Sequence, residues 1–433
     1  MRLKKTILVL LGAVACAPAG TGVRSGFAEP RCCSAEGHAV AERHRMAAIG
    51  SRRFTHAEFW SALEPSLGSS SLTVREVGRS VHDRPIRAVE FGRGPVTVLL
   101  WSQMHGDEST ATMSLADIIA WFASQSPAEG QLRERLASQL RIVMIPMLNP
   151  DGAELFQREN AIGIDVNRDA RNLVTPEART LKAVRDSLRP QFGFNLHDQN
   201  ARITAGNNGN QVAIALLAPA ADEQRSYGPT RSTARLVAAV IASVLQKEIP
   251  GRLARYSDTF EPRAFGDLMQ QWGTSTVLIE SGAMPDDPEK QKLRALNVVA
   301  ILSALDAMAT GSWRNTDPAA YEGVPTNSRS AVDVLVRGGS LVLPGGQPVR
   351  ADIALNHEEP VARRGPRVRD VGDLSAVIAI DTIDVSGLFL HPEPSMLTRR
   401  QNATWIRFDT TAAFAVRRGP SASSDLVRTI GEK

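Results

Sequence analysis

A histidine and a glutamate three positions apart are the first candidates for chemistry in the chain. His105 and Glu108 follow the apolar run 96–100 and lie in a turn that contains Gly106. An imidazole and a carboxylate at this spacing can bind one cation, and zinc favours such mixed nitrogen and oxygen ligation. A catalytic zinc site also needs a third protein ligand and an open position for water. The motif alone is more often a solvated surface loop than a metal site, so the rest of the sequence has to supply the missing ligand.

Two more polar residues, His197 and Glu280, each end an apolar segment that predicts a buried strand. Open α/β sheets place their sites at the carboxyl ends of central strands, where such side chains meet. His197 completes a set of two histidines and one glutamate, which is a known ligand set of catalytic zinc. Glu280 is then the candidate general base, because a carboxylate beside the metal can accept a proton from water.

The elements that position these residues alternate between strands and helices. Apolar segments at 140–147 and 275–280 predict buried strands, while 110–124 and 287–308 predict helices. This alternation predicts an α/β fold with a mixed, largely parallel central sheet flanked by helices. We expect this catalytic domain to span residues 51–312.

The character of the sequence changes after the predicted catalytic domain. Residues 313–330 are rich in Asn, Pro, Gly and Ser, which predicts a linker. Beyond it, short apolar segments such as 332–337 and 350–355 are separated by glycine-rich hairpin signals. We therefore expect a small all-β accessory domain over residues 331–433.

The N-terminus has the pattern of a secretory signal. A basic start precedes an apolar core at 7–15, which is too short to cross a bilayer. We expect residues 1–19 to be a signal peptide and the mature protein to be secreted or periplasmic. Cys16 follows a loose lipobox-like pattern and is a candidate for a lipid anchor. Residues 20–50 are small, charged and non-periodic, and they predict a disordered lead-in.

Charge and cysteine content argue against some classes of function. The formal net charge is +4, and removal of the three basic residues of the signal leaves +1. This balance argues against a nucleic-acid partner. Apart from Cys16, the cysteines are Cys32 and Cys33. The predicted catalytic domain therefore has no thiolate for a metal site and no disulfide framework.

Five motifs stand in the same order as in a known family. The sequence resembles the zinc carboxypeptidases, the M14-type metallopeptidases, over roughly residues 70–310. The motifs are His105-x-x-Glu108, Asn149-Pro-Asp-Gly152, Asp165-x-Asn167-Arg168, His197 and Glu280-Ser-Gly282. The ordered combination is far more specific than any single motif in it.

The resemblance implies one zinc ion per chain, with His105, Glu108 and His197 as its ligands. It further implies that Asp165 receives the imidazole N–H of His105 and so fixes its tautomer. In the family, the position of Glu280 is that of the general base.

The resemblance also implies how a peptide substrate is bound. Asn167 and Arg168 match the pair that binds the terminal carboxylate, for which a planar guanidinium is well suited. Arg158 lies in the loop where the family keeps an arginine that stabilises the oxyanion. A surface salt bridge is the alternative role for Arg158, and Arg171 is a rival for the family role.

One family feature has no secure match in the sequence. The family usually has a mobile tyrosine roughly twenty residues before the catalytic glutamate. Here Asp258-Thr-Phe260 occupies that region, with Tyr256 nearby and Tyr227 further away. The predicted β domain also lies outside the resemblance.

The predicted function is a secreted or periplasmic zinc carboxypeptidase that hydrolyses the C-terminal peptide bond of peptides with a zinc-activated water. One alternative is a zinc-dependent amidase or deacylase acting on cell-wall peptides or acyl-amino acids. Arg168 suits any substrate with a free carboxylate, so it does not separate these two. Another alternative is a catalytically inactive binding protein of the same fold. Glu280 argues against it, because a binding protein needs no base beside the metal.

Overall fold

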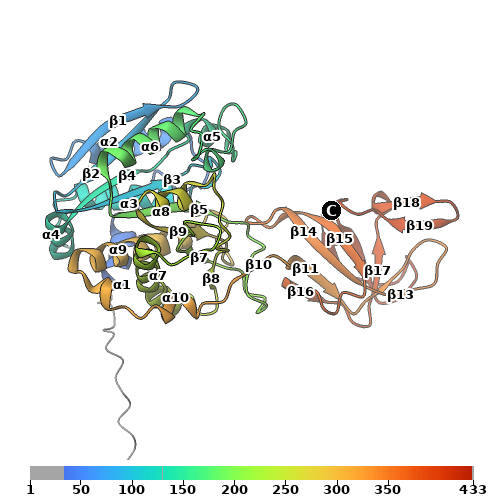
Figure 1. Ribbon diagram of the computed structural model, residues 1–433. Coiled ribbons are helices and arrows are strands. Elements are labelled where there is room, and N and C mark those ends of the chain that lie inside the picture. The colour runs from blue at the N-terminus through green and yellow to red at the C-terminus, as the bar shows by residue number, and fades with distance from the viewer. Residues whose placement is uncertain (1–33, 129, 432–433) are drawn as a thin grey trace, which may run out of the picture.

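The computed structural model describes residues 34–128 and 130–431. Two units lie side by side, a larger one with helices around a sheet and a smaller one made of strands (Figure 1). The predicted signal peptide and Cys16 lie outside the described residues.

An eight-stranded mixed sheet forms the centre of the larger unit, in the order β1-β2-β4-β3-β5-β9-β7-β8. Its middle strands β4, β3, β5 and β9 are parallel to one another, and antiparallel pairings with β2 and β7 flank them on the two sides. The predicted mixed, largely parallel sheet is therefore confirmed. The strands are β1 Leu72–Arg79, β2 Pro85–Phe91, β3 Val96–Ser102, β4 Leu140–Ile145, β5 Phe192–Asp198, β7 Ile214–Leu217, β8 Leu253–Arg255 and β9 Ser275–Ser281.

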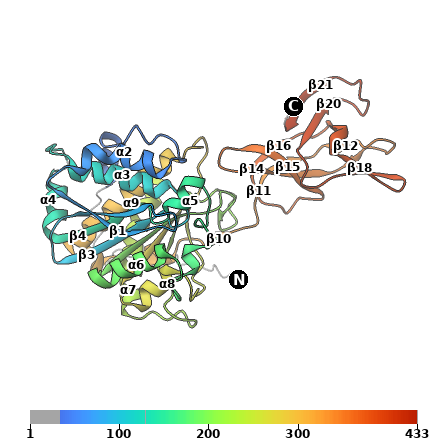
Figure 2. The same cartoon turned by 90° about the horizontal axis from the view of Figure 1, so that it is seen from above.

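Helices cover both faces of this sheet (Figure 2). They are α1 Ser34–Arg43, α2 His56–Leu67, α3 Thr110–Ala123, α4 Gly130–Gln139, α5 Pro150–Leu155, α6 Pro176–Leu188, α7 Pro229–Glu248, α8 Phe265–Gln271, α9 Gln291–Thr310 and α10 Ala319–Glu322. Short 3-10 helices are η1 Val166–Arg168, η2 Ser312–Asn315 and η3 Pro394–Met396.

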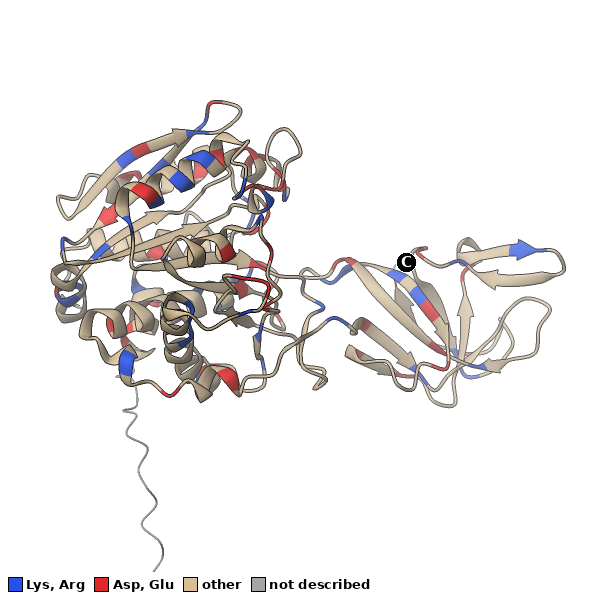
Figure 3. Cartoon of the chain, in the orientation of Figure 1, with Lys and Arg blue, Asp and Glu red and all other residues tan. Residues whose placement is uncertain are grey.

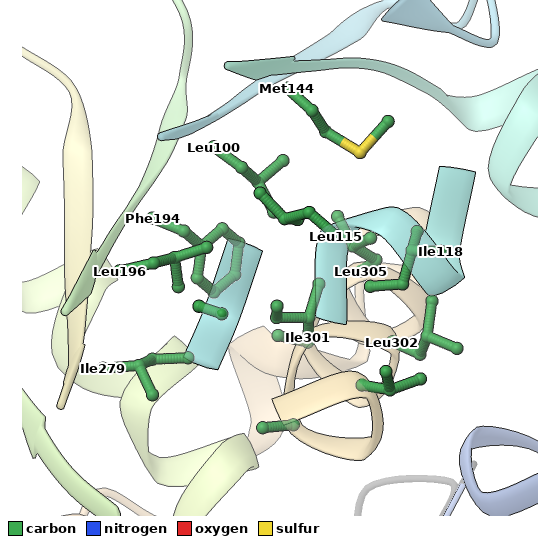
Figure 4. Packing of buried hydrophobic residues seen from close by; sticks show 14 of the residues in the cluster. Leu100, Leu115, Ile118, Met144, Phe194, Leu196, Ile279, Ile301, Leu302 and Leu305 are labelled. Carbon is green, nitrogen blue, oxygen red and sulfur yellow. The ribbon is translucent and has the colours of Figure 1, made fainter. Parts of the chain in front are cut away.

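The central strands are apolar along their length because both of their faces are buried. On one face, Leu100, Phe194 and Ile279 pack against side chains of α3 and α9 (Figure 4). On the other face, side chains of α6 and α8 pack against β3 and β4. Burying each large aliphatic side chain contributes about 1.5–3 kcal/mol, so the strand ends that carry the site project from a rigid platform.

Helix α9 is long and apolar enough to cross a membrane by length and composition alone. In the structure, 83% of its apolar window is buried within the protein. We therefore interpret it as a core helix.

The prediction of a disordered lead-in over 20–50 is wrong for residues 34–50, and residues 20–33 lie outside the described part. Helix α1 packs on α9, where Gly37 comes so close that an added Cβ would lie 3.0 Å from the Cα of Val299. Two charged core residues hold the following turn: Arg294 donates to the carbonyls of Met46 and Ile49 and pairs with Asp117. These contacts come from distant parts of the sequence, so the local composition does not reveal them.

The segment between the units is tied to the larger one. Its short strand β10 Asn327–Ser328 pairs with β6 Thr204–Ala205. The smaller unit then forms two sheets, in the orders β15-β14-β11-β16 and β13-β12-β17-β20-β21, and a separate hairpin of β18 and β19. Its strands are β11 Val332–Arg337, β12 Ser340–Leu341, β13 Val349–Arg350, β14 Asp352–Glu359, β15 Arg364–Gly372, β16 Ala379–Asp384, β17 Phe389–Pro392, β18 Leu397–Arg400, β19 Ala403–Ile406, β20 Ala413–Arg417 and β21 Leu426–Gly431.

The two sheets enclose a core of their own, centred on Val336, Ile353, Leu390 and Phe414. The predicted all-β character of the C-terminal region is confirmed.

Candidate metal centre and substrate pocket

The sheet brings the predicted site residues to one edge. In the parallel register of β5 and β9, His197 lies directly opposite Glu280. The turn after β3 brings His105 and Glu108 to the same edge. That turn needs a glycine, because a Cβ on Gly106 would lie 1.9 Å from the carbonyl carbon of Gly152.

The side chains of His105, Glu108 and His197 form a buried cluster in which one ligand atom from each residue lies within 4.8 Å of the others. The Nδ1 atom of His105 is 2.8 Å from one Glu108 oxygen, and Nδ1 of His197 is 2.7 Å from the other. The two Nδ1 atoms are 3.2 Å apart.

This donor set fits a zinc ion. Zinc bonds of roughly 2.0–2.1 Å to nitrogen and oxygen in a tetrahedron place the ligand atoms roughly 3.3–3.4 Å apart. The observed separations of 2.7, 2.8 and 3.2 Å are shorter than this by about 0.1–0.7 Å, so a bound ion requires the side chains to move apart by less than 1 Å. Two imidazoles and one carboxylate, all buried, have the chemistry that a catalytic zinc site requires.

Asp165 orients His105 from behind, at the ring nitrogen that faces away from the cluster. Its carboxylate lies 3.0 Å from Nε2 of His105 and also binds Arg158 through two hydrogen bonds of 3.0 and 2.9 Å. Burial alone would lower the pKa of His105, but Glu108 and Asp165 raise it to about 9. Burial opposes ionisation of Asp165, yet its bond to His105 and the charge of Arg158 hold its pKa below the usual range.

Arg158 also contacts the cluster of His105, Glu108 and His197, through the guanidinium nitrogen that does not bind Asp165. Its Nη1 lies 3.3 Å from a Glu108 oxygen and 3.1 Å from Nδ1 of His105. Its rival Arg171 lies outside the cavity lined by the cluster, in a separate depression of the surface. The structure therefore places the positive charge of Arg158 beside the reaction centre.

Glu280 is buried at the cavity wall, with 7% of its surface exposed. Burial, reinforced by the negative charge of Glu108, raises its pKa well above the usual range for a carboxyl. In the described parts of the chain, no hydrogen bond engages its side chain. It is therefore available to accept a proton from a water molecule.

Asn167 and Arg168 lie on the same cavity wall, in η1. The backbone N–H of Phe265 donates to the side-chain oxygen of Asn167 at 2.9 Å, so the amide nitrogen points toward His197, 3.3 Å away. Arg168 donates to the carbonyl of Asn167 at 2.9 Å, and its Nε lies 3.4 Å from Glu261. Both residues thus present N–H donors in the cavity, as carboxylate binding requires.

These residues line one cavity of about 830 Å³, and Asp165 supports it from behind His105. The sequence left the choice of tyrosine open, and the structure places Tyr256 in the wall, whereas the exposed Tyr227 is outside it.

Two further acidic residues of the cavity, Asp198 and Asp267, have no role predicted from the sequence, although Asp198 follows His197 in a polar stretch. Asp198 forms a buried ion pair of 2.9 Å with Lys290, accepts a hydrogen bond from Thr110, and donates its backbone N–H to Glu108 at 3.0 Å. Asp267 lies in the wall, in the first turn of α8. The positions of these side chains depend on contacts across the fold, and no local motif marks them.

Asp267 gives the protein a predictable pH dependence. Burial is the main reason that its pKa is raised to about 7. Between about pH 4 and pH 7 the unfolded chain has lost this proton while the folded protein keeps it, so stability falls as the pH rises. Asp267→Asn cannot ionise, and its oxygen can still accept the 3.1 Å hydrogen bond from the N–H of Glu261. We expect the variant to have a higher Tm than the parent at pH 8 and a similar Tm at pH 4.

Thermal unfolding at both pH values measures this effect, with the exposed Asp425→Asn as the control that changes neither Tm. An Asp267→Asn variant with the same Tm shift at pH 4 and pH 8 would show that the carboxyl is ionised across this range.

The comparison with known proteins agrees with this geometry. The zinc carboxypeptidase family model matches residues 64–212. This segment contains every predicted site residue except Glu280, which the fold brings to the same cavity. The resemblance of this part of the chain to zinc carboxypeptidases is thereby confirmed.

Individual relatives match over shorter stretches. Probable carboxypeptidase 2 of Arthroderma benhamiae is 28% identical over 109 residues, which cover 25% of this chain and 20% of the relative. The catalytic chain of carboxypeptidase N from Rattus norvegicus is 30% identical over 118 residues, covering 23% of this chain and 26% of the relative. The chain thus spans about a fifth to a quarter of the length of these relatives. A metallo-carboxypeptidase from Burkholderia cenocepacia superposes with a TM-score of 0.47 and 16% identity over 59% of this chain and 70% of that one.

Proposed function

From the zinc carboxypeptidase segment at residues 64–212, we propose that this protein is a zinc-dependent carboxypeptidase that hydrolyses the C-terminal peptide bond of peptides. The observation that carries this proposal is the buried cluster of His105, Glu108 and His197 with the carboxyl of Glu280 in the same cavity. A metal site that serves structure alone has no use for a buried acid of raised pKa beside it.

The cluster residues would hold the metal, and Asp165 would keep the ring of His105 oriented toward it. When bound, zinc supplies Lewis acidity, which lowers the pKa of water and polarises a carbonyl. Glu280 would take the proton from the attacking water and pass it to the leaving amine. The guanidinium of Arg158 would stabilise the negative charge that develops on the carbonyl oxygen.

Asn167 and Arg168 would select a substrate with a free terminal carboxylate. The amide nitrogen of Asn167 is held in position by the bond from Phe265 to its oxygen. Arg168 would add a charge-assisted bond from its guanidinium, which is planar and permanently positive. A carboxylate anchored here would place the last peptide bond of the substrate near the metal ligands and Glu280.

The metal is the first test of this proposal. We expect the purified protein to bind about one zinc per chain, because three ligands and one open position complete a catalytic zinc site. His105→Ala and His197→Ala should each lose most of this zinc, since two ligands hold the ion far more weakly than three. Elemental analysis of dialysed protein measures the stoichiometry, and the exposed His82→Ala is the matched control that should keep it. Full zinc occupancy in His197→Ala would refute the ligand assignment.

A further inference from the structure

Among the described residues, some of the arginines that line the cavity form an ion pair with an acidic residue and others do not. Three of its five arginines have an acidic partner: Arg158 pairs with Asp165, Arg168 with Glu261 and Arg202 with Asp333. The other two are Arg329 and Arg369. Among the residues that the structure describes, no ion pair joins either of them to an acid.

The acidic residues of the cavity do not offset these two charges. Asp198 is paired with Lys290, and Glu108 lies between the two histidines. The carboxyls of Asp267 and Glu280 are buried in the cavity wall, and among the described residues no ion pair joins either of them to Arg329 or Arg369. The wall that holds the two arginines is therefore a site of uncompensated positive charge.

Both arginines come from the C-terminal part of the chain, and contacts with the larger unit hold that part in place. Arg329 directly follows β10, which pairs with β6. Beside it, the Asn327 amide donates to Gln199 at 2.8 Å. Figure 3 shows basic residues on the segments that join the two units. The backbone that precedes Arg329 is thus anchored to the larger unit, and Arg329 itself lines the cavity.

The smaller unit is anchored at the same place. Arg202 donates to the buried Asp333 at 2.9 Å and also to the carbonyl of His357. Asp333 in turn accepts the backbone N–H of His357 at 2.6 Å. This junction connects β11 and β14 to the loop that follows β5. Asn356 of β14 and Arg369 of the neighbouring β15 line the cavity.

A β-bulge presents Arg369. In the pairing of β14 with β15, Ala354 lies opposite Asp370 and Leu355 lies opposite Val368. Arg369 is therefore the extra residue of the bulge, and it has no partner across the ladder. Bulges re-aim side chains and are common next to active sites. Here the bulge leaves Val368 in the core and Arg369 exposed at the cavity.

We propose that Arg329 and Arg369 form a subsite for a carboxylate on the acyl side of the scissile bond, so that the enzyme prefers peptides with an acidic residue there. The inference rests on the proposed function, because it deepens the substrate specificity of the same site. The proposed partner of the terminal carboxylate, Arg168, comes from η1 of the larger unit and lies beside Glu261. An acidic residue on the acyl side of the scissile bond then lies near Arg329 and Arg369, which come from the C-terminal part of the chain.

The surroundings of Tyr256 support this arrangement. Burial and the charge of Glu280 raise the pKa of its phenol, while the charge of Arg329 opposes the rise. Tyr256, Glu280 and Arg329 line the same cavity, so a peptide that reaches the base lies in the cavity that also holds Arg329. Guanidinium groups suit carboxylates because they can donate two parallel hydrogen bonds.

Matched peptides test the subsite. Each pair has the same sequence and a free C-terminus, with Glu in one peptide and Gln in the other at the first, second or third position on the acyl side. We expect the wild type to favour the Glu peptide about tenfold in kcat/KM for at least one position, the range for two partly exposed ion pairs. The R329A/R369A double variant should lose this preference, and R329K/R369K should recover part of it. Arg350→Ala, exposed on β13 and outside the cavity, is the matched control that keeps the preference.

Equal kcat/KM for Glu and Gln peptides at all three positions would overturn the subsite, and so would a preference that survives in R329A/R369A. If no peptide is hydrolysed, the proposed function fails, and binding of the same peptide pairs, measured by calorimetry, judges the subsite alone. Tighter binding of the Glu peptide that is lost in R329A/R369A supports it. Equal binding of the two peptides overturns it.

Discussion

Replacement of Glu280 by glutamine is expected to lower kcat by at least about 10²–10⁴-fold, the usual contribution of a general base, while zinc content stays unchanged. The amide is nearly the size of the carboxylate, so the buried wall at the end of β9 should keep its packing. Glutamine cannot accept the proton of the attacking water. Because Glu280 is not one of the three clustered ligands, its loss should affect proton transfer and leave metal binding intact.

The pH dependence gives a second measurement on the same variant. A base with a raised pKa is protonated at low pH, so the wild-type rate should fall on the acidic side of its profile. The Glu280→Gln variant should lose this acidic limb, because the group responsible for it no longer titrates.

Glu177→Gln is the matched control for this experiment. Glu177 is also a buried glutamate whose pKa is raised by burial, and it lies outside the cavity. Its substitution should leave kcat unchanged. Zinc content, inhibitor affinity and kcat should be measured on the same preparations. Near-wild-type turnover in Glu280→Gln would mean that the base is another residue and that the proposed mechanism is wrong.

The larger unit could be predicted from sequence because its signals are local. The strands β3, β4 and β9 are buried on both faces, so each appears as a continuous apolar run. A polar residue at the end of such a run is conspicuous, and the order of the sheet then brings these ends together. His197 and Glu280 were recognisable for this reason, although they are far apart in the chain.

Other elements carry no such signal. Strand β15 has one buried residue, and four of its nine residues are charged, so it has neither an apolar run nor a clean alternation and was not predicted. Helix α1 is stabilised by its contacts with α9, and its short sequence gave the wrong prediction of disorder. Both depend on tertiary contacts, which override weak local preferences.

The same distinction applies to the site. His105 and Glu108 share one turn and form a motif that can be recognised in sequence. Arg329 and Arg369 reach the cavity only because one pairing between β10 and β6 and one bulge in β15 bring them there. Both arginines lie outside residues 51–312, so motifs within that region do not predict that they line the cavity.

Amidation of the substrate's C-terminus is expected to lower kcat/KM by roughly 30- to 140-fold, or about 2–3 kcal/mol. Arg168 and the amide of Asn167 can donate hydrogen bonds to a carboxylate, and the amidated substrate has no negative charge for the guanidinium to bind. We place the effect in the lower part of the range for charge pairs at binding sites, because 38% of the Arg168 side chain is exposed. Solvent weakens such an interaction relative to a fully buried pair.

Arg168→Ala should therefore lower kcat/KM for the free peptide by a similar factor and have little further effect on the amidated one. This non-additivity distinguishes a direct contact from general damage to the site. Arg171→Ala, outside the main cavity, is the matched control and should behave as the wild type with both substrates. Equal hydrolysis of free and amidated peptides by the wild type would indicate an endopeptidase or an amidase. Arg168 would then serve the structure through its bonds to Asn167 and Glu261, because nothing in the reaction would depend on a terminal carboxylate.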